Sequence, residues 1–206
     1  MITHDYPNWL IYLNQSVYIS QILICFGLQD IAPVSTLFSV KHDLFIIQFP
    51  QSKAKKHTYK KYARNIYFLS LVGSFLFATQ TYPNIQFAVS LIAQFGGNHG
   101  IVHLEARKRV LYYLKGTIDL DLVLRRHSQS GFDLMEWINS NWAQDLDNYH
   151  LTSGSVFDVR EGVISWSPRK QPTVAMSLVE VEYIVLANVT RKAIWLCILL
   201  EELNFS

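Results

Sequence analysis

Four residues in the second half of the chain have types and spacing that could bind a metal ion. Asn139 and Asn141 lie two residues apart in a candidate strand, whose alternation places them on one face. Glu180 and Glu182 begin a candidate helix, where a spacing of two turns side chains about 200° apart, so only one can face a sheet. Divalent ions prefer anionic oxygens, whereas asparagine offers a neutral carbonyl. Polar residues at a solvated strand end, and a glutamate that stabilises a helix N-terminus, are the simpler alternatives.

Two clusters of basic residues could instead contact phosphate groups. The formal net charge of +2 is too small to imply a polyanionic partner, so the distribution of charge matters more than its sum. Cations that project from a well-packed helix suit contact with a nucleic-acid backbone without reading of its bases. An ordinary solvated helix face is the alternative. The clusters are Lys53, Lys55, Lys56, Lys60, Lys61 and Arg64, and Arg107, Lys108, Arg109 and Lys115.

The elements that must position these residues are mainly helical in the first half. Hydrophobic residues make up 50% of the 206 residues and charged residues 17%, which favours a folded core over disorder. Apolar residues recur at helical spacing, after a short strand-like stretch near residue 10. Residues 33–60 show no sustained period, so we expect an exposed basic loop over 41–64. The predicted helices cover 17–26, 66–80, 84–95 and 101–115.

The character of the sequence changes after Gly116. Alternating residues predict strands, and a turn at 160–162 suits a hairpin between the last two. A long stretch with helical spacing follows from about residue 178. The predicted fold class is therefore α+β, with a helical part over 1–118, then three antiparallel strands and a helix over 130–206. The candidate strands are 120–126, 132–139, 153–159 and 162–168.

The cysteines and the apolar stretches of the sequence indicate the cellular compartment in which we expect the protein. Cys25 and Cys197 lie far apart in apolar sequence, so we expect two buried free thiols in a reducing compartment. His4 and Asp5 precede the first apolar run, which does not fit a secretory signal. The apolar stretch 66–79 is shorter than the roughly 18 residues of a spanning helix. We therefore expect an intracellular protein, cytoplasmic or nuclear, without a membrane span.

The motifs, in their order along nearly the whole chain, resemble those of copia-type retrotransposon polyproteins. The stretch SLVGSFLFATQTYPNIQFAVSLIAQF is similar to two helices of the reverse transcriptase, and HLEARKRVLYYLKGT to the last helix of its thumb/connection region. The stretch ISWSPRKQPTVAMSLVEVEY, with NWAQDLDN before it, resembles the opening of the RNase H domain. The resemblance implies a reverse transcriptase thumb/connection-like region over 1–118 and the N-terminal part of an RNase H-like domain over 130–206.

The resemblance also implies roles for the candidate site residues. The intact family combines RNA-directed DNA polymerase with ribonuclease H, which uses two Mg²⁺ ions held by carboxylates to cut the RNA of an RNA–DNA hybrid. Asn139 and Asn141 stand where the family has aspartates, and Glu182 stands at its helix glutamate. The next family carboxylate would fall after Ser206, and the polymerase aspartates before Met1. We therefore expect no bound metal, no cofactor and no small-molecule substrate.

Three hypotheses about function follow. The first is a non-catalytic remnant that contacts RNA–DNA hybrid or other nucleic acid through phosphates. The second is a domesticated or effector-like module that binds other proteins, and the third is an active nuclease in which Asp145 or Asp147 replaces Asn139. Because the sheet edge would be uncovered, we also expect residues 130–206 alone to be marginally stable or to aggregate. The phosphate contacts of the first hypothesis would come from Lys55, Lys56, Lys60, Lys61, Arg107, Lys108, Arg109 and Lys115.

Overall fold

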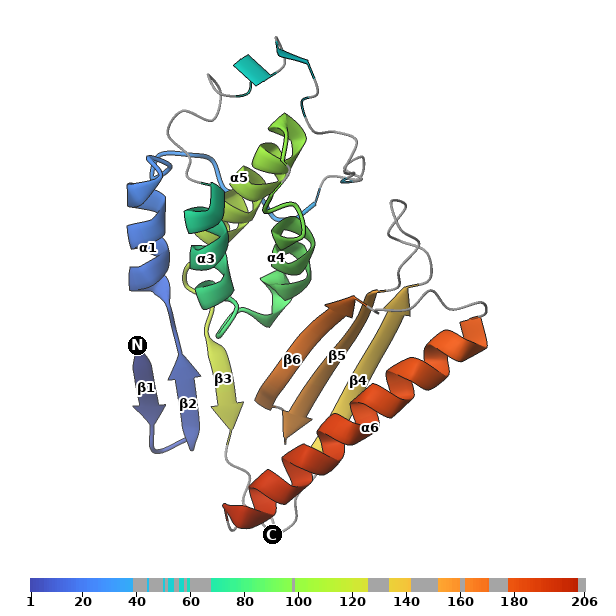
Figure 1. Cartoon of the computed structure of the whole chain (residues 1–206). Helices are drawn as coiled ribbons and strands as arrows, with labels where there is room; N and C mark the ends of the chain where they lie inside the picture. The colour runs from blue at the N-terminus through green and yellow to red at the C-terminus, as the bar shows by residue number, and fades with distance from the viewer. Residues whose placement is uncertain are drawn as a thin grey trace. The chain divides into compact units, whose positions relative to one another are not determined.

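A computed structural model of the chain confirms the predicted α+β class (Figure 1). The chain divides into two units. Unit 1 comprises Met1 and Asn14–Asp121, and unit 2 comprises Ile2–Leu13 and Leu122–Ser206. The structure describes residues 1–38, 44, 50, 52, 53, 56, 57, 59, 68–97, 99–125, 134–141, 152–159, 162–170 and 178–203.

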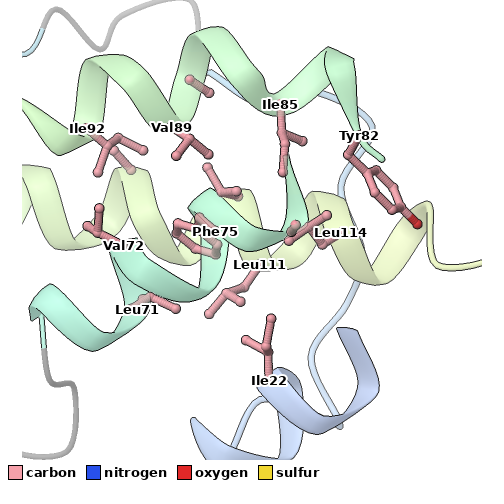
Figure 2. Packing of buried hydrophobic residues seen from close by; sticks show 14 of the residues in the cluster. Ile22, Leu71, Val72, Phe75, Tyr82, Ile85, Val89, Ile92, Leu111 and Leu114 are labelled. Carbon is pink, nitrogen blue, oxygen red and sulfur yellow. The ribbon is translucent and has the colours of Figure 1, made fainter. Parts of the chain in front are cut away.

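Unit 1 is built from helices whose apolar residues recur every three or four positions. Such a stripe is stable only when it packs on other apolar surface. Phe75, Ile85 and Leu111 are at most 1% exposed, and Figure 2 shows them among side chains that come from different helices. The described elements are α1 (Ser16–Cys25), α3 (Phe68–Ala78), the 3₁₀ turn η2 (Pro83–Ile85), α4 (Gln86–Ala93) and α5 (Ile101–Gly116).

The ends of these helices follow from particular residues. Gly27 lies just after α1 with φ +64, a left-handed conformation that glycine adopts without strain. Pro83 begins η2, where its missing N–H costs nothing. At the start of α5, the Gly100 N–H donates a hydrogen bond to His103 Nδ1 at 3.0 Å.

The segment 41–64, expected to be an exposed loop, contains helical and buried residues. Lys53, Lys56, His57 and Tyr59 are helical, and Leu44 belongs to the core of unit 1. The lysines alone suggested a solvated segment, but the apolar residues between them supply a surface that can pack. Lys55, Lys60, Lys61 and Arg64 lie outside the described residues.

The described residues of unit 2 form two antiparallel sheets and one long helix. The first sheet has the order β1–β2–β3, and its β2 pairs with β3 in the register Leu10↔Arg125. The second sheet has the order β4–β5–β6, with a bulge between Phe157 and Asp158 on β5. The sequence did not predict β1. The elements are β1 (Ile2–Asp5), β2 (Leu10–Leu13), β3 (Leu122–Arg125), β4 (Leu134–Asn141), β5 (Thr152–Val159), β6 (Gly162–Lys170) and α6 (Leu178–Glu202).

The helix α6 packs on the second sheet through one stripe of side chains. Val181, Val185, Val189 and Leu196 are buried at helical spacing against Phe157, which is 0% exposed. Among the described helices, α6 alone is long and apolar enough to cross a membrane, judged by length and composition only. The buried stripe gives α6 the packing of a helix that covers a sheet.

Candidate functional site

The strand β4 carries both asparagines of the candidate ion site. Asn139 pairs with Gly154 and Asn141 with Thr152 on β5, so the prediction that the two share one strand is confirmed. The structure describes the backbone at these two positions. Two residues before Asn139, the Nε1 of Trp137 donates a hydrogen bond to Asp158 Oδ2 at 3.0 Å. This hydrogen bond joins a side chain of β4 to a side chain of β5.

The retained glutamate of the candidate site lies on α6. Val181 is 1% exposed and faces the sheet, whereas its neighbours Glu180 and Glu182 are exposed. Across the part of the chain that the structure describes, His, Cys, Asp and Glu form no group of three or more that could hold a metal ion. Among these residues Glu182 thus lacks the companion carboxylates that a two-ion site requires.

An electrostatic interaction between Glu136 of β4 and Lys192 of α6 was missed by the sequence analysis. Burial raises the pKa of Glu136, and the positive charge of Lys192 opposes this shift. Burial in turn lowers the pKa of Lys192, and Glu136 opposes that shift. Lys192 Nζ also lies 5.6 Å from the centre of the Phe157 ring. The available signal was the position of Glu136 two residues after Leu134, on the core side of the alternation.

Arg107 is a core residue, which corrects its prediction as an exposed phosphate contact. Its side chain is 0% exposed on α5, and so is His103 one turn before it. Burial lowers the pKa of Arg107 to about 9, and the nearby Tyr59 opposes the shift. The Tyr59 ring packs against His99 with centroids 5.4 Å apart, and the Phe95 ring against His103 at 4.3 Å. A guanidinium enclosed in this way cannot reach a phosphate from solvent.

Two further cations of α5 hold the segment that follows α1. Lys115 Nζ donates hydrogen bonds to the carbonyl oxygens of Gln29 at 2.6 Å and Ile31 at 2.7 Å. Arg109 donates from Nε to the Thr36 carbonyl at 3.0 Å and from Nη2 to Thr36 Oγ1 at 2.6 Å. These bonds give both side chains a structural role that competes with phosphate contact. Lys108 is half-buried, and Lys53 and Lys56 are exposed.

We expect Lys115→Met to lower the free energy of unfolding of unit 1 by about 1–2 kcal/mol, because it removes two charge-assisted hydrogen bonds. Hydrogen exchange should show faster exchange in residues 29–36, and urea unfolding should give the free energy. Lys53→Met is the matched control, since Lys53 is exposed, and should change stability by less than about 0.5 kcal/mol. Equal exchange in both variants would contradict the structural role of Lys115.

The two cysteines are free and exposed, so the expectation that they are buried is wrong. Cys25 is the last residue of α1. Cys197 follows the buried Leu196 on α6, which turns it away from the sheet. Apolar neighbours in the sequence were therefore not sufficient to predict burial of either thiol.

Comparisons with known proteins identify the family. The chain is 35% identical to Secreted RxLR effector protein 161 of Plasmopara viticola, over 66% of the chain and 94% of that protein. It is 31% identical to an uncharacterized mitochondrial protein of Arabidopsis thaliana, over 92% of the chain and 73% of that protein. It is also 33% identical to the Retrovirus-related Pol polyprotein from transposon TNT 1-94 of Nicotiana tabacum, over 98% of the chain.

The Pol polyproteins are much longer than the matched stretch. The chain spans 15% of the transposon TNT 1-94 polyprotein and 12% of the transposon RE1 polyprotein of Arabidopsis thaliana, to which it is 31% identical. No protein-family model and no solved structure matches the chain. With several relatives matched over nearly its whole length, the chain belongs to the family of retrovirus-related Pol polyproteins of transposons.

Proposed function

We propose that the chain is a non-catalytic part of a copia-type retrotransposon Pol polyprotein, covering the thumb/connection end of its reverse transcriptase and the beginning of its RNase H-like domain. The observation that carries the proposal is the pair of asparagines on β4, Asn139 and Asn141, where the resemblance places aspartates. The order of helices before β4 and of three antiparallel strands before α6 supports the assignment.

The loss of charge at β4 is the physical reason for expecting no catalysis. A two-metal nuclease concentrates two dications within about 4 Å, which only several carboxylates can stabilise. Asparagine at positions 139 and 141 provides neutral oxygens in place of two negative charges. Glu182 supplies one exposed carboxylate. The described residues therefore do not fit a pair of Mg²⁺ ions.

The proposal also includes residual binding of a nucleic-acid backbone, through fewer basic residues than the sequence predicted. Arg107 lies in the core, and Arg109 and Lys115 are bonded to the segment after α1. Phosphate contacts would then fall to Lys53, Lys56 and Lys108, together with the lysines outside the described residues. So few contacts predict weak binding to an RNA–DNA hybrid, with little discrimination between sequences and a loss of affinity as salt rises.

The test is a hybrid titration with Mn²⁺ present. We expect the wild-type chain to leave an RNA–DNA hybrid uncut, to bind it weakly, and to show no Mn²⁺ binding by calorimetry. Asn139→Asp with Asn141→Asp restores two carboxylates and should produce measurable Mn²⁺ binding. Cleavage by the wild-type chain that Glu182→Gln abolishes and the neighbouring control Glu180→Gln retains would show that the proposal is wrong.

A second candidate, a module that binds other proteins, is favoured by one of the comparisons. The relative from Plasmopara viticola is named a secreted effector, and the alignment covers 94% of its length. The outer side of α6 also exposes large apolar residues, among them Tyr183, Ile194 and Trp195. The titration above separates the two candidates, because a protein-binding module predicts no affinity for the hybrid at any salt concentration.

A further inference from the structure

One segment of unit 1, residues 28–36, lies along α5 without forming a helix or a strand, and we call it the strap. The N–H of Val34 donates to the carbonyl oxygen of Tyr112 on α5 at 3.3 Å, which is long for such a hydrogen bond. A Cβ added to Gly116, the last residue of α5, would lie 3.1 Å from the Cβ of Pro33. The strap is therefore in contact with the C-terminal half of α5.

The middle of the strap lies outside the core of unit 1. Leu28 and Ile31 at one end, and Leu37 just after the other end, pack against the buried cluster of this unit. Between these anchors, residues 32–36 are exposed apart from Val34, which is half-buried. Because hydrophobic stabilisation scales with the apolar area removed from water, detachment of 32–36 from α5 sacrifices little of it.

The strap is held on α5 by two charged donors whose acceptors are neutral. Lys115 Nζ donates to the carbonyl oxygens of Gln29 and Ile31, and Arg109 donates to the carbonyl oxygen and the hydroxyl of Thr36. Within the described residues these acceptors are all uncharged oxygens, so the hydrogen bonds leave both positive charges unbalanced. A phosphate offers the same cations a full negative charge, and it offers a guanidinium two parallel bonds.

The strap occupies on α5 the position of a nucleic-acid backbone. It directs oxygen atoms at Arg109 and Lys115, which are separated by about 9 Å along the helix axis. Asp30, between the two residues whose carbonyls Lys115 binds, is exposed and is the only charged residue of the strap. A phosphate that approaches these cations therefore meets acceptors already in place and a negative charge beside them.

The distribution of charge favours an extended polyanion as the competing ligand. Unit 1 contains 11 basic and 5 acidic residues, a net charge of +6, whereas unit 2 contains 7 and 11, a net charge of −4. The sequence between Asp43 and Glu105 has no acidic residue and includes the basic cluster over 53–64. A polyanion is attracted by the field of the whole unit, in addition to its contacts with single side chains.

We propose that the strap is an autoinhibitory segment, which a nucleic-acid backbone displaces when its phosphates take over Arg109 and Lys115. Residues 32–36 detach from α5, while Leu28 and Leu37 keep the two ends anchored. The complex then contains two phosphate contacts that the free chain lacks, and the work of releasing the strap lowers the observed affinity. This inference rests on the proposed residual binding of nucleic acid and adds how that binding is regulated.

Hydrogen exchange of the full chain, with and without a saturating RNA–DNA hybrid at low salt, tests the release. We expect the amides of 31–36 to exchange faster in the complex, and those of α5 to exchange at the same rate or more slowly. A ligand that only covers this surface slows exchange in the strap as well. Unchanged or slower exchange there would overturn the inference and leave the proposed binding intact, whereas a hybrid that does not bind at all would overturn both.

Polyglutamate in place of the hybrid separates nucleic acid from an acidic protein as the ligand. Carboxylates carry less charge per group than phosphates and are not spaced as they are along a nucleic-acid backbone. We therefore expect polyglutamate, at the same concentration of charge, to leave the exchange of 31–36 unchanged. Faster exchange with polyglutamate and not with the hybrid would assign the strap to an acidic protein partner and overturn the inference.

Thr36→Val removes one acceptor of Arg109 and leaves both cations in place. Because fewer bonds are given up when the strap leaves, this variant should bind the hybrid about two- to fivefold more tightly than the wild-type chain, as measured by fluorescence anisotropy. Ser35→Val is the matched control, since Ser35 is the exposed neighbour of Thr36 and bonds to neither cation, and should leave the affinity unchanged. Affinity of Thr36→Val equal to or weaker than that of the wild-type chain would overturn the inference.

Lys115→Met distinguishes takeover by phosphate from simple loosening of the strap. The variant frees the strap at Gln29 and Ile31, and it also removes a cation that the hybrid is expected to contact. It should therefore bind the hybrid more weakly than the wild-type chain and show a smaller dependence of affinity on salt. Tighter binding by Lys115→Met, with the salt dependence unchanged, would mean that Lys115 does not exchange its carbonyl acceptors for phosphate and would overturn the inference.

Discussion

Replacement of Phe157 by alanine is expected to lower the free energy of unfolding of unit 2 by about 3–5 kcal/mol. Phe157 is 0% exposed at the centre of the cluster formed with Val181, Val185, Val189 and Leu196. Its ring also carries the contact with Lys192. Because the described cluster is small, few neighbouring side chains are available to fill the cavity, and the cost should fall in the upper part of that range.

Urea unfolding, with hydrogen exchange to separate the two units, measures this effect. Ile164→Ala is the control, since Ile164 lies on β6 of the same sheet and is 37% exposed. It should cost less than about 1.5 kcal/mol, as expected for a side chain that is already partly solvated. A loss below about 1 kcal/mol in Phe157→Ala would mean that α6 and the sheet are held together by other contacts.

Replacement of Arg107 by methionine is expected to change how the stability of unit 1 depends on pH. The guanidinium is 0% exposed, and burial lowers its pKa to about 9. Methionine has a similar length and carries no charge. Arg107→Lys is the control, because it keeps a buried positive charge.

The same substitution should reduce the acid sensitivity of unit 1. Burial lowers the pKa of His99 from 6.5, and the charge of Arg107 lowers it further. Below pH 6.5 the unfolded chain therefore binds more protons than the folded chain, so stability is full above this pH and is lost as the pH falls. Arg107→Met removes one cause of the shift and should shrink the difference in unfolding free energy between pH 7.5 and pH 5.5. An unchanged difference would exclude coupling between Arg107 and His99.

Local periodicity was sufficient to predict α1, α3, α4 and α5, because each helix buries a stripe that recurs within its own sequence. The same helical spacing places Arg107 on the buried face of α5, together with His103, Val110 and Leu114. Its charge led to the opposite prediction. Amino-acid type is a weaker guide than spacing when a long side chain lies between apolar neighbours on one helix face.

Pairing between distant segments could not be predicted from the sequence. The register that joins Leu10 to Arg125 depends on backbone hydrogen bonds, which leave no pattern in either short strand. The arrangement of the candidate site could likewise be predicted only in part. The sequence placed Asn139 on a strand and Glu182 on a helix, but the orientation of Glu182 depends on which side of α6 packs on Phe157. That choice is made by the tertiary contacts of the whole helix.

The pairing of β2 with β3 has a consequence for the order of events during folding. Along the chain, β1 and β2 of unit 2 come first, Asn14–Asp121 of unit 1 follow, and the remainder of unit 2 begins at Leu122. On a ribosome, the first hairpin must therefore wait until the whole of unit 1 has been synthesised before β3 can join it. Closing so long a loop is slow, and the waiting hairpin exposes an unpaired strand in the meantime. The rate at which β3 docks, more than the stability of either unit, is then expected to decide how much of the newly made chain escapes aggregation.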